Sequence, residues 1–224
     1  AAAAKMLEHA AALKEVLVQT IAGNHPNIPS DIADQRFWAC RRFLAHFLAG
    51  PKAGQVFTLN YDLLLYWTLM HDDMPFGDPV ALVTNDGFGN DEDDPDADYV
   101  VWQGETGAHD AKVHFLHGAL HLFDSGSELK KYTWIRKQVR LIDQARDAIA
   151  ADAYPLFVAE GTSVQKKAKI RHNAYLYQGF KQFTANVKVG THCVFVYGHS
   201  LAENDDHILT RIGRGRFPKL YVGI

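Results

Sequence analysis

Apolar residues recur at helical spacing over the first fifty positions of the chain. This pattern predicts one helix over residues 5–22, ended by Gly23-Asn24, and a second over residues 31–49. Ser30 is the expected N-cap of the second helix, and Gly50-Pro51 would stop it. The expected core positions of that helix are Phe37, Trp38, Phe43, Leu44 and Phe47.

From residue 55 the pattern changes to short apolar runs that alternate with helical stretches. Strands are predicted at 56–59, 99–103, 112–116, 121–124, 156–158, 193–197 and 219–224, with further candidates at 81–83 and 132–135. Helices are predicted over 63–70, 138–150, 165–186 and 203–212. Apolar strands separated by helices are typical of a parallel sheet covered on both faces. The predicted fold is therefore α/β, a Rossmann-like parallel sheet with helices on both faces.

Two parts of different style are expected along the chain. Residues 1–54 form a helical N-terminal part, and residues 55–224 form the Rossmann-type domain. Residues 77–135, acidic at first and then rich in short strands, are expected to be an insertion in that domain. The chain opens on four alanines and stops inside an apolar run, so we expect it to be part of a longer protein.

The net charge of -3 hides one acidic segment. Six acidic side chains fall within residues 91–98, and without them 20 acidic residues face 23 basic ones, so the remainder carries about +3. A solvated loop is the plain interpretation, because clustered like charges repel one another. A cation site or a loop that faces a basic partner is the alternative.

Composition also bears on the compartment. No apolar run approaches the ~18 residues that span a membrane, and no signal peptide is visible. We therefore expect a cytoplasmic protein without a membrane partner. Cys40 and Cys193 lie in apolar segments and are expected in the core, and a disulfide between them is not expected in the cytosol.

Polar turns follow several of the predicted strands. They are Thr58–Asp62, Glu160–Ser163, Gly198–Ser200 and His117-Gly118. Because the carboxyl ends of parallel strands meet in one crevice, these turns predict a nucleotide or polar small-molecule site. Each also has a local alternative: Asn60, Asp62 or Ser200 could cap a helix, Glu160–Ser163 could be only a turn and cap, and the His117 ring could bond a loop carbonyl.

Three of these turns, in their order along the chain, resemble motifs of the sirtuin-like superfamily. The matching segments are Val56–Asp62, Phe115–Gly118 and Val196–Leu201, and the resemblance covers residues 55–224. It is closest to a bacterial branch, a stand-alone family related to NAD-consuming anti-phage defence effectors.

The resemblance implies a role for individual residues. Asn60 would hold the nicotinamide ribose and a water, and His117 would act as general base near the ribose hydroxyls. Gly198 and Ser200 would cradle the dinucleotide, and Asp205 or Asp206 would support that loop. The other residues expected to contact NAD are Thr58, Asp62, Gly118, Glu160 and Thr162.

These residue types suit cleavage of the bond between nicotinamide and ribose. The reaction passes through an oxocarbenium-like state and needs a base with a pKa near neutrality, for which histidine is suited. We therefore expect an NAD⁺ glycohydrolase that uses NAD as its substrate and acts in bacterial anti-phage defence. Its expected partners are further copies of itself and a defence component such as an ATPase or a nucleic-acid-sensing protein.

Two departures from the superfamily pattern refine this expectation. A Gly-rich phosphate loop does not precede Asn60, so either it lies upstream of the given chain or NAD binds poorly. Sirtuin deacylases carry a four-cysteine zinc ribbon, which two cysteines cannot form, so deacylation is disfavoured and no zinc is expected.

Other functions stay open. The same fold could sense NAD or ADP-ribose, or serve as an assembly platform, without turnover. A metal-dependent hydrolase would draw on His114, His117, His121 and Asp124, although residues three apart on a strand point to opposite faces, and no metal ligand is predicted. Basic stretches at 130–140, 166–171 and 211–219 could touch phosphates or simply face solvent.

Overall fold

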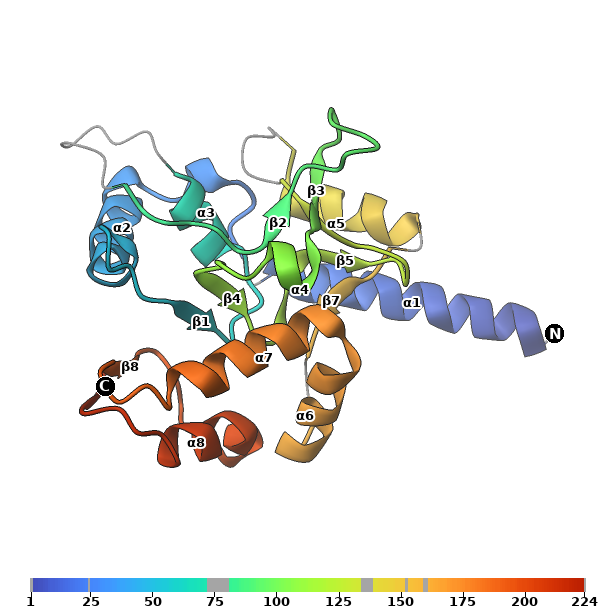
Figure 1. The fold of residues 1–224 in the computed structure, drawn as a ribbon. Helices are drawn as coiled ribbons and strands as arrows, with labels where there is room; N and C mark the ends of the chain where they lie inside the picture. Colours follow the sequence, from blue (N-terminus) through green and yellow to red (C-terminus); the bar gives the residue numbers. More distant parts are fainter. Residues whose placement is uncertain are drawn as a thin grey trace.

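The parallel strands of this chain form two separate pairs. The computed structural model describes residues 2–23, 25–71, 81–133, 139–151, 153–158 and 161–223. In it, β1 (Val56–Thr58) pairs in parallel with β4 (Val113–Phe115), and β8 (Val194–Val196) pairs in parallel with β9 (Leu220–Val222) (Figure 1). Each strand lies within a segment predicted as a strand, and each is shorter than expected.

The longest sheet of the described residues is antiparallel. Its strand order is β2 (Phe88–Gly89), β3 (Tyr99–Trp102), β6 (Leu129–Tyr132), β5 (Gly118–Asp124) and β7 (Pro155–Phe157). The insertion expected at about 77–135 contributes every strand of this sheet except β7, together with β4 of the parallel pair. Helices together with parallel and antiparallel strands confirm the α/β class. The division of the chain at residue 54 stays a prediction.

Helices pack around these strands. They are α1 (Ala2–Gly23), α2 (Asp34–Leu48), α3 (Leu64–Met70), α4 (Gly104–Gly107), α5 (Leu141–Ala150), α6 (Ser163–His172), α7 (Ala174–Asn186) and α8 (Asp206–Gly213). α7 contacts β4 and α6, and α6 contacts α8, so these three helices form a layer below β1 and β4 (Figure 1). Among the described residues, no helix combines the length and apolarity that crossing a membrane requires.

The core lies where α3 and α7 meet the strands. Its most completely buried side chains include Trp67, Phe115, Leu122 and Leu176, each less than 2 % exposed. A buried cation, Arg41, donates from its guanidinium to the carbonyls of the last turn of α3, which lack partners within the helix. This contact links α2 to α3.

α1 lies against α5 and extends well beyond the rest of the molecule (Figure 1). The Arg146 guanidinium lies 2.8 Å from the Glu15 carboxylate across this contact. Both side chains are partly exposed, so this pair orients the helices more than it stabilises them.

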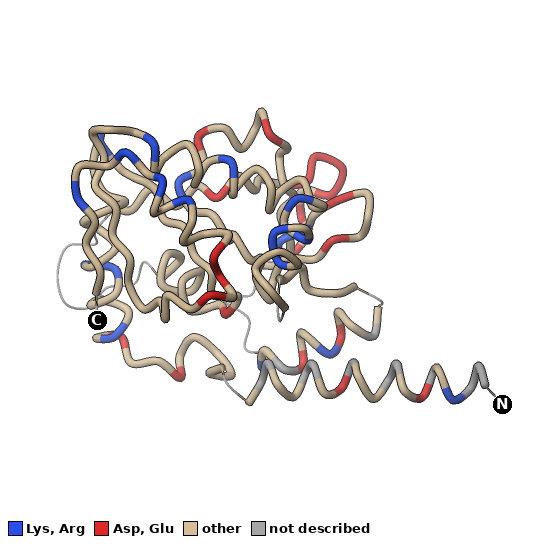
Figure 2. The backbone as a smooth tube through the Cα atoms, turned by 90° about the horizontal axis from the view of Figure 1, so that it is seen from below, with Lys and Arg blue, Asp and Glu red and all other residues tan. Residues whose placement is uncertain are grey.

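The acidic segment 91–98 forms one protruding loop (Figure 2). Its acidic side chains are exposed except Asp91, which accepts hydrogen bonds from the Tyr99 hydroxyl and the Asp93 N–H. The solvated-loop interpretation agrees with this exposure.

Two helix predictions differ from the structure, one at the start of its helix and one in the middle. Ser30 lies in a short 3₁₀ helix, Pro29–Asp31, and α2 begins after Ala33 without a side-chain cap. The helix predicted over 165–186 is broken at Asn173, whose side chain accepts the Leu176 N–H and starts α7. Apolar periodicity continues across this break and does not reveal it. The signal in the sequence that could have predicted the break was Asn173, a residue type that favours the N-cap position.

Several burial and strand expectations also need correction. Cys40 and Cys193 are exposed rather than in the core, and Phe195 on β8 is 52 % exposed. Residues 81–83 form no regular strand, while β2 was not predicted. The candidate strand at 132–135 overlaps β6 only at Tyr132, and residues 134–138 lie outside the described residues.

Acid should destabilise the fold through its buried histidines. Burial is the main cause that lowers the pKa of His114 to about 4 and the pKa of His121 well below its ordinary value. Unfolding restores a pKa near 6.5, so the unfolded chain binds more protons, and stability present above that pH is lost as the pH falls toward 4. We expect a loss of about 1 kcal/mol per pH unit for each histidine, measured by urea denaturation across this window. A flat profile would contradict the assignment.

Replacing His121 by phenylalanine should stabilise the protein. His121 is fully buried and stacks on Tyr66, and its ring nitrogens have no hydrogen-bond partner among the described residues. His121→Phe keeps an aromatic ring and removes two unsatisfied polar atoms, so we expect a gain of about 1 kcal/mol in the free energy of unfolding. Urea denaturation measures it, and exposed His192→Phe is the control. A loss of stability in His121→Phe would point to an unseen polar partner.

Candidate functional site

The turn between β4 and β5 carries His117. The carbonyl of His117 accepts a hydrogen bond of 2.7 Å from the Val158 N–H, just past the end of β7. Gly118 follows with a φ of 79°, and a Cβ there would collide with the backbone of Leu156. Glycine is therefore required, because this conformation and this close approach both exclude a side chain.

The loop that carries Asn60 runs beside this turn. The Leu116 N–H donates to the Thr58 carbonyl at 2.9 Å, and the Leu120 N–H donates to the Tyr61 carbonyl at 2.8 Å. Asn60 lies between these two links, and its exposed side chain belongs to the loop that flanks His117. The carboxyl ends of β1, β4 and β7 therefore meet where the polar turns were expected to converge.

The His117 ring faces a second histidine, ninety positions further along the chain. The two Nε2 atoms of His117 and His207 are 3.0 Å apart, and both side chains are about 95 % buried. The Nδ1 atom of His207 lies 3.2 Å from the Ser163 hydroxyl, which also accepts the His207 backbone N–H at 2.6 Å. Ser163 opens α6 and His207 lies in the first turn of α8, so the packing of these helices sets the geometry.

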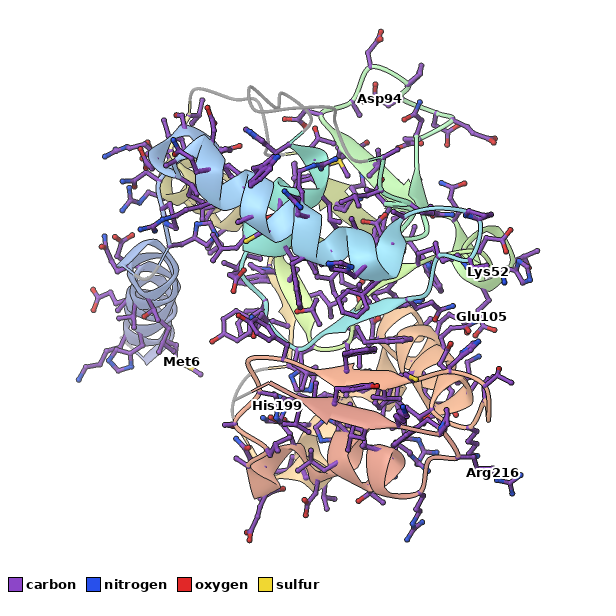
Figure 3. All side chains as sticks on the ribbon, turned by 90° about the vertical axis from the view of Figure 1, so that its left-hand side faces the viewer. Met6, Lys52, Asp94, Glu105, His199 and Arg216 are labelled. Carbon is purple, nitrogen blue, oxygen red and sulfur yellow. The ribbon has the colours of Figure 1, made fainter. Side chains whose placement is uncertain are left out.

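Asp205 supplies the negative charge beside this pair. Its Oδ1 atom is 3.9 Å from His117 Nε2 and accepts a 2.9 Å hydrogen bond from the Lys166 ammonium. Its Oδ2 atom is 3.5 Å from His199 Nε2, and the other ring nitrogen of His199 accepts the Leu201 N–H. His199, labelled in Figure 3, comes from the turn after β8. We call the residues His117, Ser163, Lys166, His199, Asp205 and His207 the histidine–aspartate cluster.

Burial controls the protonation of this cluster. The pKa of His117 is lowered to about 4, mainly by burial and also by the neighbouring His207, while Asp205 acts in the opposite direction. Burial also lowers the pKa of His207. Burial disfavours ionised Asp205, but the hydrogen bond and charge of Lys166 outweigh this and hold the pKa of Asp205 below its ordinary value. At neutral pH both histidines are therefore neutral beside an ionised carboxylate, and an unprotonated ring can accept a proton.

A hollow of about 210 Å³ adjoins the cluster between α6 and α8. Ser163 and His207 contribute to its wall, and three cationic side chains against one carboxylate leave its lining net positive: Lys167, Arg211 and Arg214 with Asp206. Small-molecule sites usually measure about 300–1,000 Å³, so this space suits part of a ligand, and its charge favours an anionic part.

Thr58, Asn60 and Gly118 lie on the two linked turns beside and including His117, and the other sequence-predicted residues fall into three groups. His117 belongs to the histidine–aspartate cluster, and Gly198 and Ser200 flank its member His199. Thr162 accepts the Gln165 N–H and caps α6, and the Asp62 carboxylate accepts the Leu64 N–H just before α3, whose N-cap is Leu63. Glu160 lies outside the described residues.

Sequence reasoning missed His207 as a site residue. It placed Ser163 only within a polar turn, considered Lys166 only as part of a basic stretch, and gave Asp205 only a supporting role. Lys166 and His207 fell inside predicted helices, where their neighbours looked like ordinary solvated faces. The available signal was the Asp-x-His spacing of 205–207 after a polar turn. His114, His121 and Asp124 do not join His117 in a metal-ligand group among the described residues, although they were the candidate set.

Comparison with known proteins identifies a family. The model of a family described as a domain of unknown function, DUF4917, matches residues 2–224. The chain belongs to this family. No curated protein and no solved structure matches it.

The pair of Lys166 and Asp205 should contribute strongly to the stability of this DUF4917 chain. Asp205→Ala leaves an ammonium group that is 92 % buried without its counterion, and we expect a loss of about 3 kcal/mol in the free energy of unfolding. Glu105→Ala, which breaks the exposed pair with Lys181, is the matched control and should cost less than about 1 kcal/mol. Equal losses in the two variants, measured in urea, would show that burial does not strengthen the pair.

Proposed function

We propose that this DUF4917 protein is an NAD⁺ glycohydrolase in which His117 is the general base. The observation that carries the proposal is the buried, neutral His117 ring at the meeting point of β1, β4 and β7, in contact with His207. The ring is unprotonated at neutral pH and can accept a proton from water or a ribose hydroxyl, although its pKa of about 4 makes it a weaker base than the near-neutral one expected from the reaction.

The reaction needs a base and a ribose anchor from the protein. Water attacks the ribose carbon while the bond to nicotinamide breaks, and the bonding electron pair leaves with nicotinamide. The proton released from water goes to His117, and ADP-ribose and nicotinamide are the products. Asn60, on the loop beside His117, anchors the ribose and the attacking water, because a neutral amide both donates and accepts hydrogen bonds.

The contact between His117 and His207 supports a route for the proton. A proton taken by one nitrogen of His117 can leave through Nε2 to His207, and the Ser163 hydroxyl lies next at 3.2 Å. Asp205 favours the imidazolium that forms transiently, since it raises the pKa of His117. This relay restores the neutral base for the next turnover.

Charge at the neighbouring hollow suits a dinucleotide. Lys167, Arg211 and Arg214 supply cationic groups for phosphates, and the first turn of α6 begins at the same place with Ser163. Gly198 and Ser200, on the loop with His199, would contribute backbone N–H groups to the other side of the ligand.

In its biological setting, we propose that the enzyme acts in the bacterial cytoplasm as an anti-phage defence effector. Assembly with further copies of the chain, or with a defence component such as an ATPase or a nucleic-acid sensor, would then switch it on. The alternative is a module that binds NAD or ADP-ribose without turnover, and the same assay separates the two.

Substitution of the base or of the ribose anchor should abolish NAD cleavage. We expect His117→Ala and Asn60→Ala each to lower nicotinamide release by at least about 100-fold, the usual contribution of a positioned base. Release is measured by chromatography on purified protein and, for a silent resting state, as NAD loss in infected cells. Far-UV circular dichroism confirms folding, and exposed His192→Ala is the control.

Two results would contradict this function. Unaltered NAD loss in His117→Ala would remove the base from the mechanism. Tight NAD binding by calorimetry with no nicotinamide release in either assay would favour the sensing module.

A further inference from the structure

Three metal-ligand atoms converge within the histidine–aspartate cluster. They come from His117, Asp205 and His207, and one ligand atom of each residue lies within 4.8 Å of the other two. The Nε2 atoms of His117 and His207 are 3.0 Å apart, and His117 Nε2 is 3.9 Å from Asp205 Oδ1. Bond lengths of ~2.0–2.2 Å in a tetrahedral zinc site imply ligand spacings of roughly 3.3–3.5 Å. The observed spacings bracket that value.

We propose that His117, Asp205 and His207 bind a divalent transition-metal ion of the Zn²⁺ and Co²⁺ class. Two imidazoles and one carboxylate form a nitrogen-rich set that these ions prefer, whereas Ca²⁺ and Mg²⁺ require mostly oxygen ligands. Three protein ligands leave a fourth position for water or another small ligand. The expectation of no zinc rested on the missing four-cysteine ribbon, which is a different set of ligands.

Among the outer contacts of these side chains, that of His207 is a hydrogen bond of the kind that metal ligands make, and that of Asp205 is a charge contact. The far ring nitrogen of His207 is held by the Ser163 hydroxyl, which leaves Nε2 directed at His117. The far oxygen of Asp205 faces His199 Nε2. Hydrogen-bond partners on the remote atoms of the ligands are characteristic of metal sites, where they fix ring orientation.

The Lys166 ammonium places a positive charge beside the Asp205 carboxylate, where the metal ion would place its own. This ammonium lies 2.9 Å from Asp205 Oδ1, the atom that would coordinate the metal, and the Lys166 side chain is 92 % buried. Metal binding must displace this ammonium from the carboxylate. Lys166 therefore competes with the ion and sets the affinity of the site.

Occupancy would also govern the proposed reaction. His117 cannot pass a proton through Nε2 to His207 while both Nε2 atoms ligate a metal, so the ion inhibits NAD cleavage. This consequence rests on the proposed function, whereas metal binding itself does not.

The test is Co²⁺ titration of the untagged full-length chain. One equivalent of Co²⁺ should produce the visible absorption of a four-coordinate site, and Zn²⁺ should abolish it. We expect His207→Ala to remove the signal and Asp205→Asn, which keeps the side-chain shape, to weaken Co²⁺ binding at least tenfold. His109→Ala, which disrupts the exposed His109–Asp110 pair, is the matched control and should bind normally.

The Lys166→Met variant distinguishes competition between the Lys166 ammonium and the metal ion from a loss of binding caused by misfolding. Removing the ammonium should tighten Co²⁺ binding about tenfold, even if the free protein becomes less stable. Absence of a stoichiometric Co²⁺ signal in the wild type, a signal that persists in both His207→Ala and Asp205→Asn, or weaker binding in Lys166→Met would overturn the proposal. These readouts need no NAD turnover, so a failure of the glycohydrolase proposal would leave them interpretable.

Discussion

The short turn His117-Gly118 is the constraint on which the site depends. At this point the chain leaves β4 of a parallel pair and enters β5 of the antiparallel sheet. The left-handed conformation of Gly118 and its close approach to Leu156 allow the reversal, and the hydrogen bond from Val158 to the His117 carbonyl holds it. Because both neighbouring residues are fixed by backbone contacts, the His117 ring has little freedom in where it lies.

Electrostatics then decides what that ring can do. Two histidines, a carboxylate and an ammonium share one buried space, and in such surroundings the charged groups must pair. Lys166 and Asp205 are charged and neutralise each other, while burial keeps both rings neutral. Neutral imidazoles beside a carboxylate are able to take a proton or ligate a metal, and both roles use the same Nε2 atoms. Proton transfer and metal binding therefore exclude each other at this site.

Local chemistry made much of the fold predictable. Short runs such as Val56–Leu59 and Lys112–Leu116 contain β1 and β4, because they are rich in the β-branched and aromatic side chains that favour strands. The break at Asn173 and the exposure of Phe195 were missed for different reasons. Asn173 acts through a cap that periodicity does not register, and the exposure of Phe195 depends on what packs against β8.

By itself, the sequence determined the α/β class, the approximate elements, and the glycine and histidine of the turn after β4. Those features follow from interactions among near neighbours in the chain, which spacing and residue type encode. Only the tertiary structure brought His207, Asp205 and Lys166 to His117, and it paired the strands into two parallel pairs and an antiparallel sheet. The cluster depends on how α6 and α8 pack, and contacts across ninety residues leave no periodic trace in a single sequence.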